Sequence, residues 1–152
     1  MSKRALAVFA VVAVVAGCED ELPELVFDGG TVTSQMREWR AELISRDAVL
    51  EGSVTVLTNL DAEAFTTSIV LRSDLPMSVR FWHVNEGSCD GGGPPVGDDV
   101  AYPYLVIGDD GVASASSVVF APFSREVLHH ATVKDAAGEI LACGNFLEQA
   151  LP

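Results

Sequence analysis

Apolar and polar residues alternate along most of the chain, and this period of two is typical of half-buried β-strands. The first strand is expected over residues 39–45, and the next runs follow at 51–57 and 64–71. The residues that share one face of these runs are Trp39, Ala41 and Leu43, then Val54 and Val56, then Phe65, Thr67, Ile69 and Leu71. A helical period is absent, so the pattern predicts an all-β protein.

The run at 79–85 continues this alternation. Trp82 and Val84 should point to one side of the strand, and Phe81, His83 and Asn85 to the other. A long loop rich in Gly, Pro and Asp follows over residues 89–103, and two further hairpins are expected within 104–120 and 127–146. Short strands separated by turns every 8–12 residues predict an antiparallel β-sandwich or barrel.

The first residues look like an export signal. Lys3 and Arg4 precede an apolar run that is too short to span a bilayer, and the run ends in Val-Ala-Gly before Cys18. This ending resembles a bacterial lipobox, which predicts that Cys18 is acylated and becomes the first residue. An ordinary signal peptide or a short membrane anchor is the alternative.

We therefore divide the chain into a signal peptide at 1–17, a lipidated cysteine with an acidic tether at 18–37, and one domain at 38–152. The tether is expected to hold at most one short strand, at Leu25–Phe27. Removal of residues 1–17 leaves 135 residues, which suits a single domain.

Residues 18–152 carry 22 acidic and seven basic residues, a net charge of −15. Such a chain will not bind nucleic acid or an anionic lipid surface through charge. Attachment to a membrane is expected through acyl chains instead, and more than one chain is needed for a stable anchor. The expected location is the bacterial cell envelope, facing the periplasm or the cell exterior.

Two cysteines remain once Cys18 is assigned to lipid. Cys89 and Cys143 would reach an oxidising compartment, where a disulfide is the default. Two thiolate metal ligands are the alternative, although neither cysteine belongs to a CxxC pair.

Two motifs suggest a family. The stretch FWHVNEGSC at 81–89 and the stretch ILACG at 140–144 resemble the copper-zinc superoxide dismutases. The pattern is also similar to that of small bacterial lipoproteins of this type, which share an Ala-Tyr-Pro loop that is found here at 101–103. The resemblance implies a Greek-key β-sandwich of about eight strands. It also implies that Cys89 and Cys143 form the family's intrasubunit disulfide.

The metal ligands of that family do not carry over. Of the His-x-His pair, only His83 is present, because Asn85 stands two residues later, and amide groups bind copper weakly. The loop at 90–103, which would supply three imidazoles, contains no histidine. The last copper ligand falls near Val133, although His129 or His130 would reach this position if the strand register slips. Ile140 replaces the arginine that attracts superoxide.

The chain has only three histidines, His83, His129 and His130. We expect His83 to be a partly exposed strand residue and the other two to lie at a surface strand end, and we treat all three as weak candidates for a metal. Adjacent strand residues face opposite sides, so His129 and His130 could not easily hold one ion.

The remaining candidates for chemistry favour structural roles. Asp98-Asp99 and Asp109-Asp110 lie beside glycine, where aspartate is common in turns, and calcium binding is a lesser alternative. Phe81 and Trp82 are expected in the core or on a sheet face, although an exposed aromatic beside the glycine-rich loop could contact a partner.

The sequence thus predicts a lipid-anchored domain outside the cytoplasm, without catalytic residues or a cofactor. Its role would be structural or the binding of an unknown protein or small ligand. The alternative is a residual copper- or zinc-binding protein that handles metal or dismutates superoxide.

Overall fold

The computed structural model describes residues 36–45, 50–59, 62–73 and 75–150. Several predictions lie outside these residues. They concern the signal peptide, Cys18, most of the tether and the strand expected at Leu25–Phe27. Chain contacts separate Met1–Val32 from Thr33–Pro152, and only the second unit is described below.

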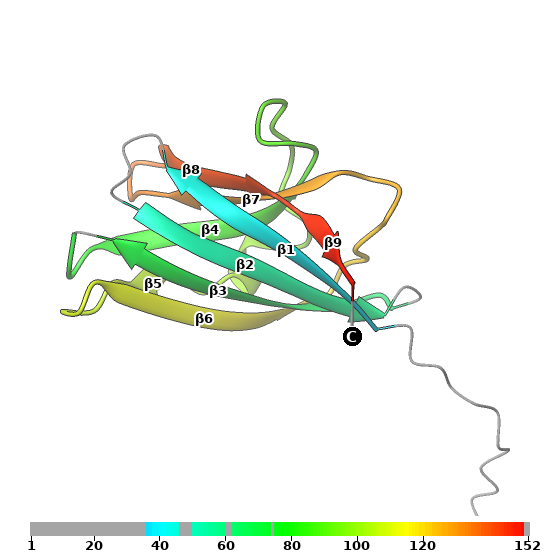
Figure 1. Cartoon of the computed structure of the whole chain (residues 1–152), viewed down its shortest axis with the longest axis horizontal. Coiled ribbons are helices and arrows are strands. Elements are labelled where there is room, and N and C mark those ends of the chain that lie inside the picture. The colour runs from blue at the N-terminus through cyan, green and yellow to red at the C-terminus, as the bar shows by residue number, and fades with distance from the viewer. Residues whose placement is uncertain (1–35, 46–49, 60–61, 74, 151–152) are drawn as a thin grey trace, which may run out of the picture. The chain divides into compact units, whose positions relative to one another are not determined.

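The regular secondary structure in the described part of the chain consists almost entirely of strands (Figure 1). They are β1 (Met36–Ser45), β2 (Leu50–Asn59), β3 (Phe65–Ser73), β4 (Val79–Glu86), β5 (Leu105–Val106), β6 (Val112–Val119), β7 (His129–Lys134), β8 (Ile140–Asn145) and β9 (Leu147–Gln149). One turn of 3₁₀-helix, η1 (Asp99–Ala101), lies in the loop before β5. Among the described residues, we find no helix with the length and apolar character needed to cross a bilayer.

All pairings between these strands are antiparallel, in the order β5-β4-β7-β8-β1-β2-β3-β6. The chain crosses from β3 to β4 and returns from β6 to β7, so the connections form a Greek key. The sheet curls until β5 approaches β6 and the barrel is nearly closed. The predicted all-β Greek-key class is confirmed.

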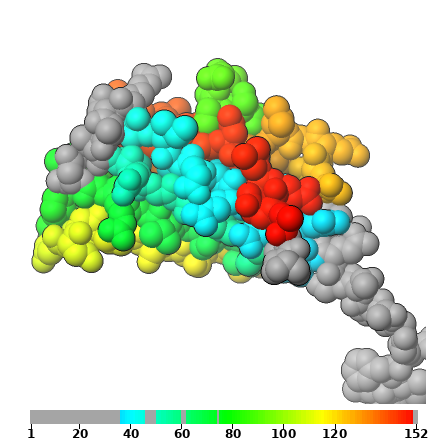
Figure 2. All heavy atoms as spheres, in the orientation of Figure 1, coloured from blue at the N-terminus to red at the C-terminus, as the bar shows by residue number. Residues whose placement is uncertain are grey.

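β9 extends the line of β8 and pairs with the start of β1. In the space-filling view, β1 and β9 lie side by side across the face turned toward the reader (Figure 2).

The predicted alternation places the core correctly. Val54, Val56, Ile69 and Leu71 are at most 1% exposed, and Trp82 is equally buried on β4. Thr67 is also buried, and its hydroxyl donates to the carbonyl oxygen of Thr55, 3.1 Å away on β2. Burial of these side chains from both walls of the barrel supplies the main stabilisation of the fold.

Candidate functional site

The loop after β4 folds back over the outer surface of the sheet. Glu86 N–H donates to the Pro94 carbonyl at 3.0 Å, and Val96 N–H donates to the Val84 carbonyl at 2.9 Å. Gly87 starts this reversal with a φ of +85°, a conformation that glycine adopts without strain. The loop therefore covers side chains of β4 and β7 that the sequence pattern alone would place in solvent.

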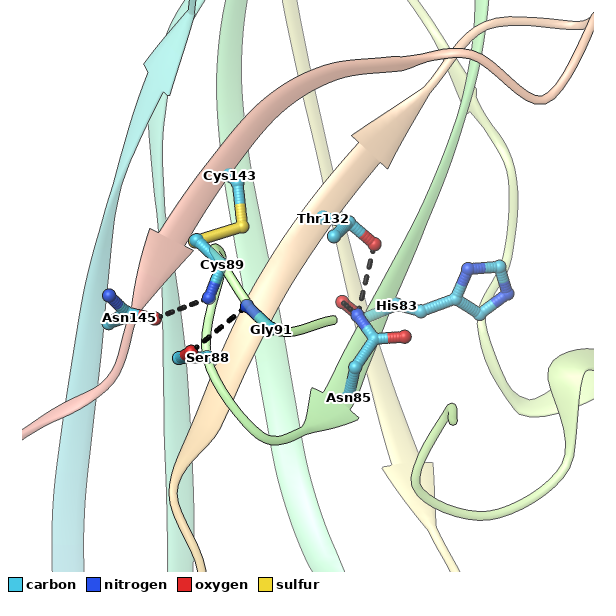
Figure 3. The surroundings of a disulfide bond; sticks show 8 residues. All are labelled: His83, Asn85, Ser88, Cys89, Gly91, Thr132, Cys143 and Asn145. Atoms are coloured by element: carbon cyan, nitrogen blue, oxygen red, sulfur yellow. Dashed lines mark hydrogen bonds between the residues drawn. A yellow bond between two sulfur atoms is a disulfide. The ribbon is translucent and has the colours of Figure 1, made fainter. Parts of the chain in front are cut away.

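The Cys89–Cys143 disulfide fixes this loop to β8, with the two Cα atoms 5.9 Å apart. Cys89 N–H also donates to Asn145 Oδ1 at 2.9 Å, and Gly91 N–H donates to Ser88 Oγ at 3.2 Å (Figure 3). The predicted disulfide is confirmed, and the thiolate-ligand alternative is wrong.

Asn85 lies under this loop and is only 3% exposed. Its Nδ2 donates to Thr132 Oγ1 at 3.0 Å and to the His83 carbonyl at 3.3 Å. Asn85 thus points, as predicted, to the side opposite Trp82, but its amide joins β4 to β7 as a buried structural link (Figure 3).

His83 is half-buried on the same outer face. Its Nε2 lies 3.6 Å from Asp99 Oδ1, and its ring meets the ring of Tyr102 edge-on with centroids 5.2 Å apart. Burial is the main effect on the His83 pKa and lowers it, although Asp99 opposes this shift. His83 is therefore a neutral imidazole near neutral pH.

The expectation of a surface strand end for His129 and His130 is wrong. His129 is 6% exposed and faces the core, where it stacks on Phe123 with ring centroids 4.1 Å apart. Burial lowers its pKa, against the raising effect of the Val127 carbonyl. His130 is 2% exposed and pairs with Asn85 across β4 and β7. Both are buried because the loop and the chain before β7 pack against them.

The three histidines do not converge. His129 faces the core, whereas His83 and His130 share the outer face and lie diagonally across Asn85 and Thr132. Within the described ranges, no three His, Cys, Asp or Glu side chains are grouped so that they could hold a metal ion. Val133, the position expected for a last copper ligand, is fully buried in the core opposite Trp82.

A pocket of about 400 Å³ opens beside His83, and we call it the aromatic pocket. Its lining residues are Phe81, Trp82, His83, Asp99, Val100, Tyr102, Tyr104, Lys134, Asp135, Ala136 and Gly138. Five of these eleven residues carry rings, and a few charged groups lie among them, which is the usual composition of a small-molecule site.

Most of this pocket is not predicted by the sequence pattern. The pattern places Val100 in a loop and Tyr104 at the start of a hairpin, and it indicates only a hairpin connection for the turn after β7. The one available signal was the clustering of aromatics on both sides of the glycine-rich loop. This clustering indicated Phe81 but not the segments around Val100, Tyr104 and the turn after β7. Those segments come together only when the barrel has formed.

A larger depression of about 990 Å³ lies over β1, β8 and the disulfide. Its two charged groups on β1 are paired with each other, since Arg40 Nε lies 2.6 Å from Glu42 Oε1. Apolar Ile44 and Ile140 lie at its rim and are 77% and 50% exposed. This depression presents less ring surface than the aromatic pocket and no free charge on β1.

No protein-family model and no curated protein matches this chain. The likeness to the copper-zinc superoxide dismutases therefore remains a prediction from the sequence.

Acid should destabilise the fold before its carboxylates titrate. Burial lowers the pKa of His83 and His129 in the folded chain, whereas an unfolded histidine keeps a pKa near 6.5. As the pH falls below about 6.5, the unfolded chain binds more protons, and stability is lost down to the lowered folded pKa values. We expect the free energy of unfolding in urea to fall from about pH 7 to about pH 5.

A variant with His83→Gln and His129→Gln lacks both of these titrating groups. Its stability should stay nearly level over the same pH range, even if the substitutions lower its absolute value. An equal slope in the variant and the wild type would assign the acid sensitivity to other groups.

Proposed function

We propose that this chain is a non-catalytic, lipid-anchored domain of the bacterial envelope that binds a small ligand in the aromatic pocket. The observation that carries the proposal is the exposure of large apolar side chains around a concave site. Phe81, Tyr104 and Val100 line the aromatic pocket and are 41%, 64% and 94% exposed. Rings held open to solvent beside a cavity are typical of a binding surface.

The polar groups near the aromatic pocket support binding better than catalysis. The Tyr102 hydroxyl donates to the Val96 carbonyl at 2.8 Å, and burial raises the Tyr102 pKa far above the neutral range. The Asn85 amide is bonded to Thr132. A general acid or base needs a free position and a pKa near the working pH, and these groups have neither.

Fragment screening by ¹H–¹⁵N NMR tests the binding role. The indole N–H of Trp82 donates to the Pro103 carbonyl at 2.8 Å and reports on the wall of the aromatic pocket, while Trp39 is an internal control in the core. Cationic, neutral and anionic ring compounds should include some that shift the Trp82 signal saturably and leave Trp39 unchanged. A set that moves neither signal would contradict the proposed site.

The envelope location rests on the Val-Ala-Gly-Cys ending of the export signal. We expect native protein from a bacterial host to begin at Cys18 and to carry acyl mass on this residue. Mass spectrometry of the purified chain measures both properties. A mature N-terminus at another residue, or an unmodified Cys18, would refute the lipid anchor.

A weak copper or zinc site is the second candidate. It is favoured by the Nδ1 atoms of His83 and His130, which are buried on the same face without a hydrogen-bond partner. Elemental analysis of the purified chain decides between the two functions. Copper or zinc near one equivalent per chain, lost in His83→Ala, would place metal handling ahead of ligand binding.

A further inference from the structure

We propose that the ligand of the aromatic pocket is an organic cation, an ammonium group carried on a compact apolar body. This inference rests on the proposed function, because it names the chemical class of ligand for the same site. It follows from the placement of the rings, the placement of the charges, and the charge of the whole chain.

Two exposed rings, those of Phe81 and Tyr104, line the aromatic pocket. Phe81 lies on the outer face of β4, and Tyr104 directly precedes β5, whose Leu105 pairs with Arg80 beside Phe81. The Trp82–Pro103 hydrogen bond holds the segment that carries Tyr104 against β4. The face of an aromatic ring is electron-rich and attracts a cation within about 6 Å of its centre.

The walls around these rings are rigid. The Tyr102 ring packs edge-on against Trp82 with centroids 5.3 Å apart, and its hydroxyl is bonded within the loop. The Ser117 hydroxyl donates to the Ala101 carbonyl and so ties η1 to β6. A ligand would therefore meet a preformed surface, which lowers the entropy cost of binding.

The lining of the aromatic pocket contains two carboxylates and one ammonium group. The Asp99 side chain is 76% exposed, and Asp135 is held in place because its Oδ1 accepts the N–H groups of Ala137 and Glu139, both at 2.9 Å. Lys134 is the one basic residue of the lining and pairs with Phe81 across β4 and β7.

The wider field favours a cation as well. The chain carries a net charge of −13, so positive ligands are attracted to it and negative ligands are repelled. An anion would have only Lys134 as an ionic partner, against Asp99 and Asp135. A neutral apolar ligand could use the rings but would gain nothing from the carboxylates.

Choline and 3,3-dimethylbutan-1-ol test the inference, because the alcohol has the same shape without the charge. We expect choline to shift the Trp82 indole signal of the full chain in a non-ionic detergent, and to bind at least about tenfold more tightly than the alcohol. Added salt should weaken choline binding, because the carboxylates that attract the cation are exposed.

Single substitutions assign the effect to residues. Tyr104→Ala and Asp99→Asn should each weaken choline binding by about three- to tenfold, whereas Lys134→Gln should strengthen it, since a competing cation is removed. Phe120→Ala is the matched control, because Phe120 is an exposed aromatic, 85% accessible, outside the lining of the aromatic pocket. It should leave choline binding unchanged.

The outcomes separate this inference from the proposed function. Equal binding of choline and the alcohol at Trp82 would overturn the preference for a cation and leave a ligand pocket in place. If anionic or neutral fragments shift the Trp82 signal and choline does not, the preference for a cation is again overturned and the ligand pocket remains. If no compound of any charge shifts Trp82, both the inference and the proposed site are wrong.

Discussion

Replacement of Cys143 by Ser should lower the free energy of unfolding by about 2–5 kcal/mol. The disulfide joins residues 54 positions apart and restricts the unfolded chain, which is worth about 4 kcal/mol in the chain-entropy account. Urea denaturation measures the difference, and Cys89→Ser should give the same loss. Wild-type protein in a reducing agent should approach both variants, because the same covalent bond is then missing.

A smaller substitution isolates the hydrogen bond beside the disulfide. Asn145→Ala removes the acceptor of Cys89 N–H and should cost about 1 kcal/mol with the disulfide intact. A loss in Cys143→Ser no larger than in Asn145→Ala would mean that the loop is held by its hydrogen bonds and not by the disulfide.

The barrel core could be predicted from the sequence because the period of two is uninterrupted there. The residues expected to share a face on β2 and β3 do so, and β1 begins at Met36, three residues before the predicted start. Each barrel strand buries one face against the other strands, so the local alternation is enough to predict which of its side chains lie in the core. The remaining information lies in how loops cover the outer faces.

The burial of Asn85 and His130 shows what the local pattern lacks. Both lie on the face that the alternation assigns to solvent, and both are buried because the loop after Gly87 returns over them. A loop rich in glycine and proline has no periodicity from which its path could be read. The path of this loop depends on the disulfide to Cys143, which lies 54 residues after Cys89.

The aromatic pocket could not be predicted from the sequence for a similar reason. The alternation predicted that Phe81 and His83 would share a face, and they do. The residues that complete the pocket come from η1, from the segment before β5 and from the turn after β7. Only the tertiary fold brings the loop before β5 and the turn after β7 to one place, so a single sequence cannot group them.

One end of the barrel is closed by an aromatic cluster that the alternating pattern does not predict. Phe123, in the loop before β7, is 5% exposed. It stacks on His129, and its ring centroid lies 5.0 Å from Trp39, 5.4 Å from Phe65 and 5.8 Å from Phe146. Tilted and edge-on ring pairs of this kind add stabilisation beyond the buried area.

Phe123→Ala should therefore lower the free energy of unfolding by about 3–5 kcal/mol, as expected for a large ring removed from a packed core. The same loop provides a matched control, because Phe120 is 85% exposed, and Phe120→Ala should change stability by less than about 0.5 kcal/mol. Urea denaturation measures the loss in the free energy of unfolding for both variants, which replace the same residue type in the same loop. Similar losses would mean that the cluster around Phe123 does not hold this end of the barrel. A large loss at Phe123 alone would show that a connecting loop, and not only the strands, completes the core beside His129.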